Sequence, residues 1–238
     1  MDRKLLVISV FLLFVIVVLN HFDKSTYIID MVHKIEGKQT VESIVNHLEV
    51  AVSERLRNAL DEAGFEDYPN EVILVGLKEE ELLQIYGRSE SGIKFIKQYP
   101  FTANSGILGP KLKEGDLQIP EGIYKIEYLN PNSSYYLSLK VSYPNEFDKL
   151  KTKFDEVIEM GGDIFIHGKS VTIGCIPIGD FAIEEVFMLV HKAMNKDTKV
   201  IISPRDFRVK DEYPNVESVE WEGELYDMIK EELVKMPS

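Results

Sequence analysis

Cysteine is almost absent from this chain, since its 238 residues include only Cys175. A single thiol forms no intrachain disulfide, and it excludes every zinc site that needs several cysteines. Basic residues are also scarce: 27 Lys and Arg stand against 40 Asp and Glu, which gives a formal charge of -13. A broad nucleic-acid interface needs clustered positive charge, so this composition disfavours nucleic-acid binding.

Internal repeats and low-complexity segments are missing as well, and the remaining composition is that of an ordinary folded protein. Hydrophobic residues make up 45% of the chain and charged residues 28%. This balance excludes a disordered, a collagen-like or a polytopic membrane protein. The length fits one domain, or one domain with additional segments.

Residues 1–20 form an apolar N-terminal stretch. Arg3 and Lys4 precede an apolar run from Leu5 to Leu19, which is shorter than the about 20 residues of a comfortable transmembrane helix. The run is typical of a signal sequence, and no small-residue cleavage site follows it. We expect an uncleaved signal anchor that exports the rest of the chain, with a cleaved signal peptide as the alternative.

Helical periodicity flanks a central region of strand-forming residues. Apolar residues recur every three or four positions over Val41–Ala63, and Gly64 is suited to end that helix. Asp180 is suited to cap a helix over 181–194, and another apolar stripe covers Trp221–Leu233. We therefore expect helices at both ends of the exported region.

Branched and aromatic runs predict the strands of the central region. The expected strands are Val72–Leu77, Glu81–Tyr86, Ile93–Phe101, Gly122–Leu129, Tyr135–Tyr143, Asp163–His167 and Lys199–Ser203. Strands and helices do not alternate regularly, which disfavours a doubly wound parallel sheet. We expect a mainly β fold, a mixed sheet or sandwich with flanking N- and C-terminal helices. The expected division is a tether and amphipathic helix at 21–66, a central domain at 67–208 and a C-terminal helix at 209–238.

The segment DIFIHGKSVTIGCIPIGD, residues 163–180, carries the candidate chemistry. His167 ends an apolar strand, and Cys175 follows eight positions later, directly after Gly174. A thiol needs a neighbouring base to become a thiolate, and imidazole is the usual one. If the chain turns back after Gly168, the two side chains can meet, and the N–H groups of Gly174 and Cys175 can stabilise an oxyanion.

Two other interpretations of this pair stay open. A lone cysteine in an apolar strand is usually a packing residue, and a histidine after a strand often only bonds to the backbone. His167 and Cys175 are also possible metal ligands, but two ligands do not complete a site, and the sequence contains no H-E-x-x-H motif. We expect neither a metal nor a cofactor.

Several ordered motifs resemble the YkuD-type L,D-transpeptidases, and in particular their YafK-like branch. The motifs, which span about residues 55 to 208, are SGILGPK at 105–111, GDLQIPEGIY at 115–124, SYPN at 142–145, IHG at 166–168 and TIGCIPIGD at 172–180. The resemblance implies a YkuD-like catalytic domain over the central region, 67–208. It also implies the activity of a cysteine enzyme of the bacterial cell wall.

The resemblance implies a role for each matching residue. Cys175 matches the nucleophile and His167 the base, while the carbonyl of Gly168 matches the group that orients the histidine. Thr172 and Gly174 match supporting positions of the cysteine motif, near the oxyanion site.

Two positions depart from the family pattern, and they concern substrate binding. Ile173 stands where many relatives have histidine, and Pro177 where many have an arginine associated with a substrate carboxylate. Lys111 is the candidate replacement for that charge, with a solvated surface lysine as the alternative. Tyr143 is a second candidate substrate contact.

The function implied by the resemblance is transpeptidation of peptidoglycan stem peptides through a thioester on cysteine. Such an enzyme contributes to peptidoglycan biosynthesis, cell wall organisation and cell shape in the periplasm. Alternatives are a hydrolase that cleaves wall peptides or a wall-linked lipoprotein, and a non-catalytic wall-binding module. We expect attachment to the inner membrane through residues 5–19.

Overall fold

The computed structural model describes residues 37–152, 159–193, 197–215 and 219–237. The expected signal anchor at 1–20 and most of the expected tether lie outside these residues. Among the helices that are described, none combines the length and the apolar character needed to cross a membrane. All elements named below belong to one unit, Val41–Ser238.

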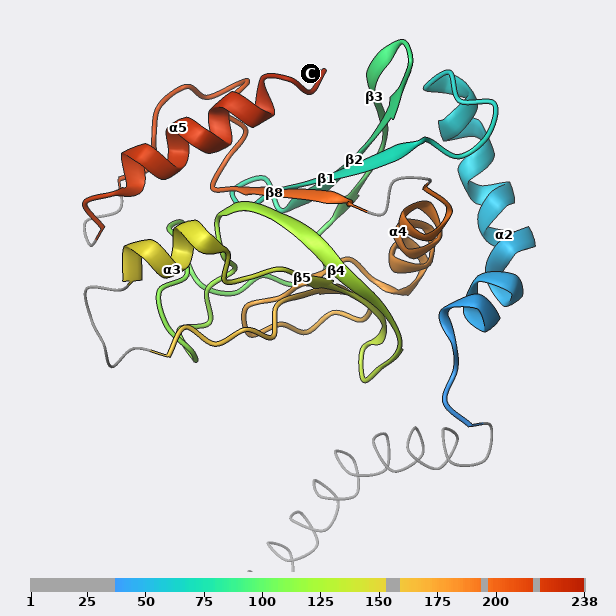
Figure 1. Cartoon of the computed structure of the whole chain (residues 1–238), viewed down its shortest axis with the longest axis horizontal. Coiled ribbons are helices and arrows are strands. Elements are labelled where there is room, and N and C mark those ends of the chain that lie inside the picture. Colours follow the sequence, from blue (N-terminus) through green and yellow to red (C-terminus); the bar gives the residue numbers. More distant parts are fainter. Residues whose placement is uncertain (1–36, 153–158, 194–196, 216–218, 238) are drawn as a thin grey trace, which may run out of the picture. The chain divides into compact units, whose positions relative to one another are not determined.

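A single mixed sheet organises this unit (Figure 1). It has 8 strands in the order β3-β2-β1-β8-β4-β5-β6-β7. The pairs β1/β8 and β6/β7 are parallel, and the other neighbouring pairs are antiparallel. The strands are β1 (Glu71–Leu77), β2 (Leu82–Ser89), β3 (Gly92–Pro100), β4 (Gly122–Ser133), β5 (Tyr136–Val141), β6 (Phe165–His167), β7 (Ile176–Pro177) and β8 (Lys199–Ser203).

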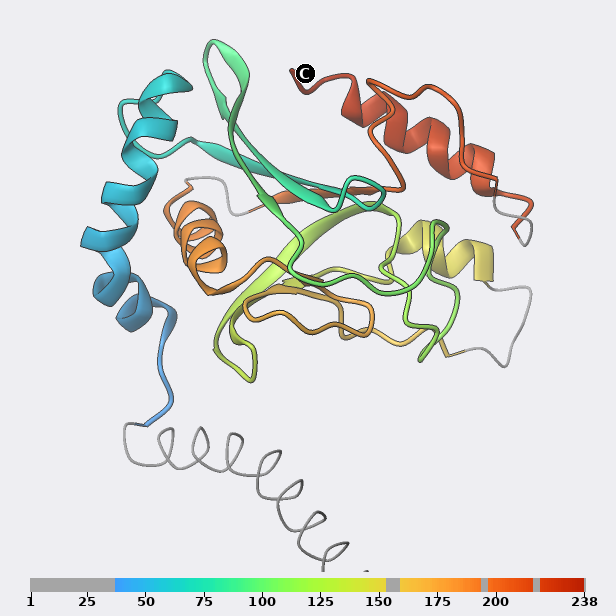
Figure 2. The same cartoon turned by 180° about the vertical axis from the view of Figure 1, so that it is seen from behind.

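Helices flank the sheet, which confirms the expected fold class. The described helices are α2 (Val41–Glu62), α3 (Glu146–Thr152), α4 (Asp180–Lys192) and α5 (Glu222–Leu233). Figures 1 and 2 show α5 on the opposite side of the β1–β2–β8 region from α4, with α2 lying outside α4.

Strand β1 is apolar at nearly every position because both of its faces are covered. Leu74 packs into the core formed with α2 and α4, whereas Ile73 and Val75 pack into the core that contains Leu225 and Ile229 of α5. A strand buried on both faces reads as a continuous apolar run, which explains the VILVGL segment.

Two local expectations are wrong. The strand expected over Gly122–Leu129 does not end at Leu129, because β4 continues to Ser133, and an irregular register between Asn130 and Ser133 accommodates Pro131. Asp180 does not cap α4, since Gly179 holds the N-cap position without a side-chain bond. The Asp180 carboxylate instead binds the backbone N–H and the ammonium of Lys169.

Candidate active site

Strand pairing brings His167 and the segment after Cys175 to one edge of the sheet. Ile166 and Ile176 are paired neighbours on β6 and β7, and both are fully buried in the core. Successive side chains of a strand point to opposite faces. His167, one position after Ile166, therefore lies on the other face of this edge, and Cys175 ends the turn that leads directly into β7.

His167 is buried and held in one orientation. Its Nδ1 lies 2.5 Å from the carbonyl oxygen of Gly168. A carbonyl oxygen only accepts, so Nδ1–H is the donor, and Nε2 keeps the lone pair that a base needs. The ring of Tyr135 stacks against His167 with centroids 4.5 Å apart. Burial lowers the pKa of His167, and the bond to Gly168 opposes this, so the neutral imidazole is favoured.

Cys175 is partly buried, and its thiol is protonated at rest. Its Sγ lies 3.5 Å from the carbonyl oxygen of Asp163, to which the S–H group donates. Burial raises the pKa of the thiol, while a backbone hydrogen bond from Phe165 and the charge of Lys140 act in the opposite direction. The resting pair is therefore a neutral thiol and a neutral imidazole, and proton transfer must accompany any nucleophilic attack.

Thr172 organises the turn that carries the cysteine. Its Oγ1 accepts the N–H groups of Gly174 at 3.1 Å and Cys175 at 2.8 Å, and it donates to the carbonyl of Cys175 at 2.7 Å. The two amides expected to serve as oxyanion donors are thus bonded to Thr172 in this structure. They reach a substrate oxygen only by sharing or releasing that bond.

Gly168 and Gly174 occupy positions where a side chain does not fit. A Cβ on Gly168 would lie 2.6 Å from Oδ1 of Asp180 and 2.8 Å from the carbonyl oxygen of Tyr135. Gly174 has φ +128, and a Cβ there would lie 3.0 Å from the carbonyl oxygen of Gln118. The cysteine turn therefore packs closely against the segment around Gln118.

Lys111 is not a solvated lysine, because its ammonium is held in a buried ion pair, and its role as a substrate contact stays a prediction. Its side chain is 6% exposed and pairs with Asp116 at 2.6 Å. The same Nζ donates to the carbonyl of Lys113, while Asp116 also accepts the backbone N–H groups of Lys113 and Gln118. The ion pair thus fixes the loop that contacts the cysteine turn.

Tyr143 is also a structural residue. It is 3% exposed, and its hydroxyl donates to the carbonyl of Lys111 at 3.2 Å. Its ring meets that of Tyr124 edge to face, with centroids 6.1 Å apart. Tyr143 therefore supports the Lys111 loop from the core and offers little surface to a ligand.

Three residues near the pair were not anticipated from the sequence. Tyr135 stacks on the His167 ring, and Lys140 is a buried cation on β5. The backbone carbonyl oxygen of Asp163 accepts the hydrogen bond of the Cys175 thiol. No local motif marks them, because strand pairing brings them to Cys175. Within the described parts of the chain, no group of three or more His, Cys, Asp or Glu residues could hold a metal ion.

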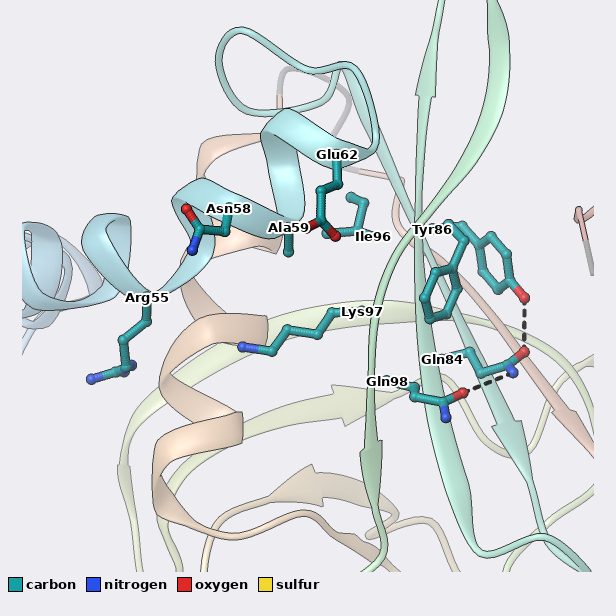
Figure 3. Close-up of a pocket in the computed structure, with 10 residues that line it drawn as sticks. Arg55, Asn58, Ala59, Glu62, Gln84, Tyr86, Ile96, Lys97 and Gln98 are labelled. Atoms are coloured by element: carbon teal, nitrogen blue, oxygen red, sulfur yellow. Dashed lines mark hydrogen bonds between the residues drawn. The ribbon is translucent and has the colours of Figure 1, made fainter.

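A groove of about 720 Å³ lies elsewhere, between α2 and the β2–β3 strands. Figure 3 shows side chains from these elements around it, with Gln84 bonded to both Tyr86 and Gln98. Neither His167 nor Cys175 lines this groove. The groove is lined by neither a cysteine nor a histidine, so the candidate chemistry stays at the β6–β7 edge.

Comparison with known proteins relates this chain to a cell-wall family. No family model matches the chain. It is 33% identical over 119 residues to "Putative L,D-transpeptidase YafK" of Escherichia coli K12, and equally to the protein of that name from strain O157:H7. The match supports a YkuD-like family. The motifs predicted this YkuD-like similarity. The matched region covers 49% of this chain and 46% of the relative, so the chain spans about half the length of the curated relatives it matches.

Two solved structures overlap with this chain in part. The helical cell shape determining protein Pgp2 from Campylobacter jejuni has a TM-score of 0.48 and 19% identity, covering 76% of this chain and 77% of its own. L,D-transpeptidase 1 of Mycobacterium tuberculosis has a TM-score of 0.32 and 13% identity, covering 56% and 62%. The YkuD-like similarity accordingly rests on the sequence match to YafK.

Proposed function

We propose that this protein is an L,D-transpeptidase-like cysteine acyltransferase acting on peptidoglycan stem peptides. The observation that carries the proposal is the geometry of His167, whose Nδ1–H is held by Gly168 so that Nε2 is left as a base at the β6–β7 edge, where Cys175 directly precedes β7. The similarity to YafK supplies the substrate class.

The neutral resting pair defines the first chemical step. The Cys175 sulfur attacks a peptide carbonyl as its proton passes to Nε2 of His167. The bond between His167 and Gly168 stabilises the imidazolium that forms, since Nδ1–H keeps its acceptor. Backbone N–H groups of the cysteine turn bind the oxyanion once Thr172 shares them.

Collapse of the tetrahedral intermediate returns the proton. The carbon–nitrogen bond breaks, the leaving amine takes the proton from Nε2, and a thioester remains on Cys175. An amine acceptor then gives a new peptide bond, whereas water gives a free carboxylate. The same pair serves both outcomes, so the acceptor decides between transpeptidation and hydrolysis.

The cellular setting of the proposal follows from the substrate. Peptidoglycan lies outside the inner membrane, and the apolar run Leu5–Leu19 is suited to export the chain and hold it there. We place the protein in the periplasm or cell envelope, attached through this run, with stem peptides or a wall-linked lipoprotein as its partners.

Defined muropeptides test the activity. The full chain is incubated with them, with and without an amine acceptor, and products are read by mass spectrometry. We expect a thioester on the wild-type protein and new peptide bonds when the acceptor is present. Products that form only with water as acceptor would move the assignment to a hydrolase, and no acyl-enzyme from any muropeptide would refute the proposal.

Variants test the pair itself. Cys175→Ala is expected to abolish turnover, and His167→Ala to lose most of it. The double variant should cost little more than either change alone, because members of one catalytic unit are strongly non-additive. A Cys175→Ala protein that still processes muropeptides would show that the cysteine is a packing residue.

A further inference from the structure

Lys140 lies on the strand next to the segment that Cys175 contacts. Register pairs Tyr128 of β4 with Lys140 of β5, and Lys140 with Phe165 of β6. Phe165 and His167 are two positions apart on β6, so Lys140 and Phe165 share the face that also carries His167. Cys175 directly precedes β7, the parallel neighbour of β6.

The Lys140 ammonium is buried and tied to the segment that holds the thiol. The residue is 8% exposed. Its Nζ donates to the carbonyl of Gly162 and lies 3.2 Å from the Asp163 carboxylate, and it sits 4.8 Å from the centre of the Phe165 ring. The Cys175 thiol donates to the backbone carbonyl of Asp163, so both side chains bind the same short segment.

The charges around the thiol differ in how strongly solvent screens them. Burial has the largest effect and raises the pKa of Cys175, and the charge of Asp163 acts in the same direction. The backbone hydrogen bond of Phe165 and the charges of Lys140 and Lys111 lower that pKa. The Asp163 side chain is 96% exposed, whereas that of Lys140 is 10% exposed. Water therefore weakens the field of the carboxylate more than that of the ammonium. His167, a titratable neighbour on this face, is favoured in its neutral form.

We propose that Lys140 is a positioning residue for Cys175, which fixes the Gly162–Asp163 backbone beneath the thiol and supplies the positive charge that stabilises its thiolate. The inference rests on the proposed role of Cys175 as nucleophile. The proposal assigns the positive charge near the thiol to Lys140 on β5, two strands away from the cysteine. It needs no positively charged residue in the cysteine motif itself.

Alkylation of the thiol tests this role without any substrate. Cys175 is the single cysteine of the chain, so iodoacetamide labelling followed by intact mass reports this residue alone. Two strand spacings separate β5 from β7, about 9.6 Å between backbones, and we take this as the separation of the two charges. By Coulomb's law, removing the Lys140 charge at that distance lowers the fraction of Cys175 thiolate about twofold with a water-like dielectric constant. The loss is about twentyfold with a dielectric constant of about 20, which is typical of a protein.

The variants are chosen to move the labelling profile in opposite directions. Lys140→Met should shift the pH midpoint of alkylation upward, and Lys140→Arg should restore it toward that of the wild type. Asp163→Asn, an exposed change with little risk to folding, should shift the midpoint downward. Lys125→Met is the matched control, because it removes the charge of an exposed lysine on β4 that pairs with Asp197, and it should leave the profile unchanged.

The outcomes separate this inference from the proposed function. Unchanged profiles for Lys140→Met and Asp163→Asn would overturn the role of Lys140, even if muropeptides are turned over. If Lys140→Met does not fold, the alkylation profiles of Asp163→Asn and Lys140→Arg decide alone. An alkylation midpoint of Asp163→Asn equal to that of the wild type then overturns the proposal. Opposite shifts without any acyl-enzyme from muropeptides would support Lys140 and refute the enzyme assignment.

Discussion

Replacing Lys111 by alanine should destabilise the protein, because the change breaks a buried ion pair. The ammonium lies 2.6 Å from Asp116, and the two side chains are 6% and 13% exposed. Removing it leaves the carboxylate without its cation in a place that water hardly reaches. Asp116 would keep its hydrogen bonds from the backbone N–H groups of Leu112, Lys113 and Gln118.

The expected loss follows from these contacts. Breaking a buried ion pair on one side costs about 3 to 5 kcal/mol. The three retained backbone bonds reduce the penalty on Asp116, so we expect a loss of about 2 to 3 kcal/mol in the free energy of unfolding. For a chain of this size, that corresponds to a fall of about 4 to 12 °C in Tm.

The pH dependence gives a second signature of the same pair. Burial alone would raise the pKa of Asp116, but bonds from Lys111 and from backbone amides outweigh it and hold the pKa below its ordinary value of 3.8. A carboxylate with a depressed folded pKa stabilises the protein above about pH 3.8, and this contribution is lost as the pH falls through the folded value. The difference between wild type and Lys111→Ala should therefore be largest near neutral pH and shrink in acid.

Urea unfolding at several pH values, with thermal melting alongside, measures both effects. Lys113→Ala is the control, since Lys113 is an exposed residue of the same loop and should change stability by less than about 0.5 kcal/mol. A Tm for Lys111→Ala equal to that of Lys113→Ala would refute the reasoning and return Lys111 to the role of a surface residue.

Three further changes test other parts of the structure. Glu121→Gln should lower the free energy of unfolding by about 3 to 5 kcal/mol, since it breaks the buried ion pair with Lys78. Tyr226→Phe, which removes one hydrogen bond to Glu121, should lower it by only about 1 kcal/mol, and equal urea midpoints for the two variants would contradict this. Thr172→Val should lower the free energy of unfolding by about 1 to 3 kcal/mol and slow thioester formation, because the N–H groups of Gly174 and Cys175 lose their acceptor. A stability and a rate of thioester formation equal to those of the wild type would contradict the role of Thr172 in organising the turn. Alkylation of Cys175 should be slow near neutral pH and still be increasing with pH at about pH 9, because burial raises the pKa of its thiol above the ordinary 9.0. A rate that is already maximal at about pH 8 would show that burial does not control the thiol.

Local sequence signals sufficed wherever the structure depends on nearby residues. The apolar period of 41–63 predicts α2, and the alternating and branched runs predict most of the strands, because each pattern reflects the face that one element buries. The motifs IHG and TIGC likewise mark His167 and Cys175. Their local bonds, from His167 to Gly168 and from Cys175 to Thr172, join residues at most three positions apart.

The sequence by itself determined the identity of the candidate pair, the helices at both ends and the mixed β character of this protein. Only the tertiary structure decided the environment of that pair. From the sequence, Lys111 is a candidate substrate contact or a surface lysine, and the folded loop shows that it pairs with Asp116. No sequence motif marks Lys140, which approaches the cysteine segment only through the pairing of β5 with β6 and of β6 with β7. The physical reason is that burial and strand register join residues far apart in the chain, and these two properties set the charge that each side chain presents to Cys175.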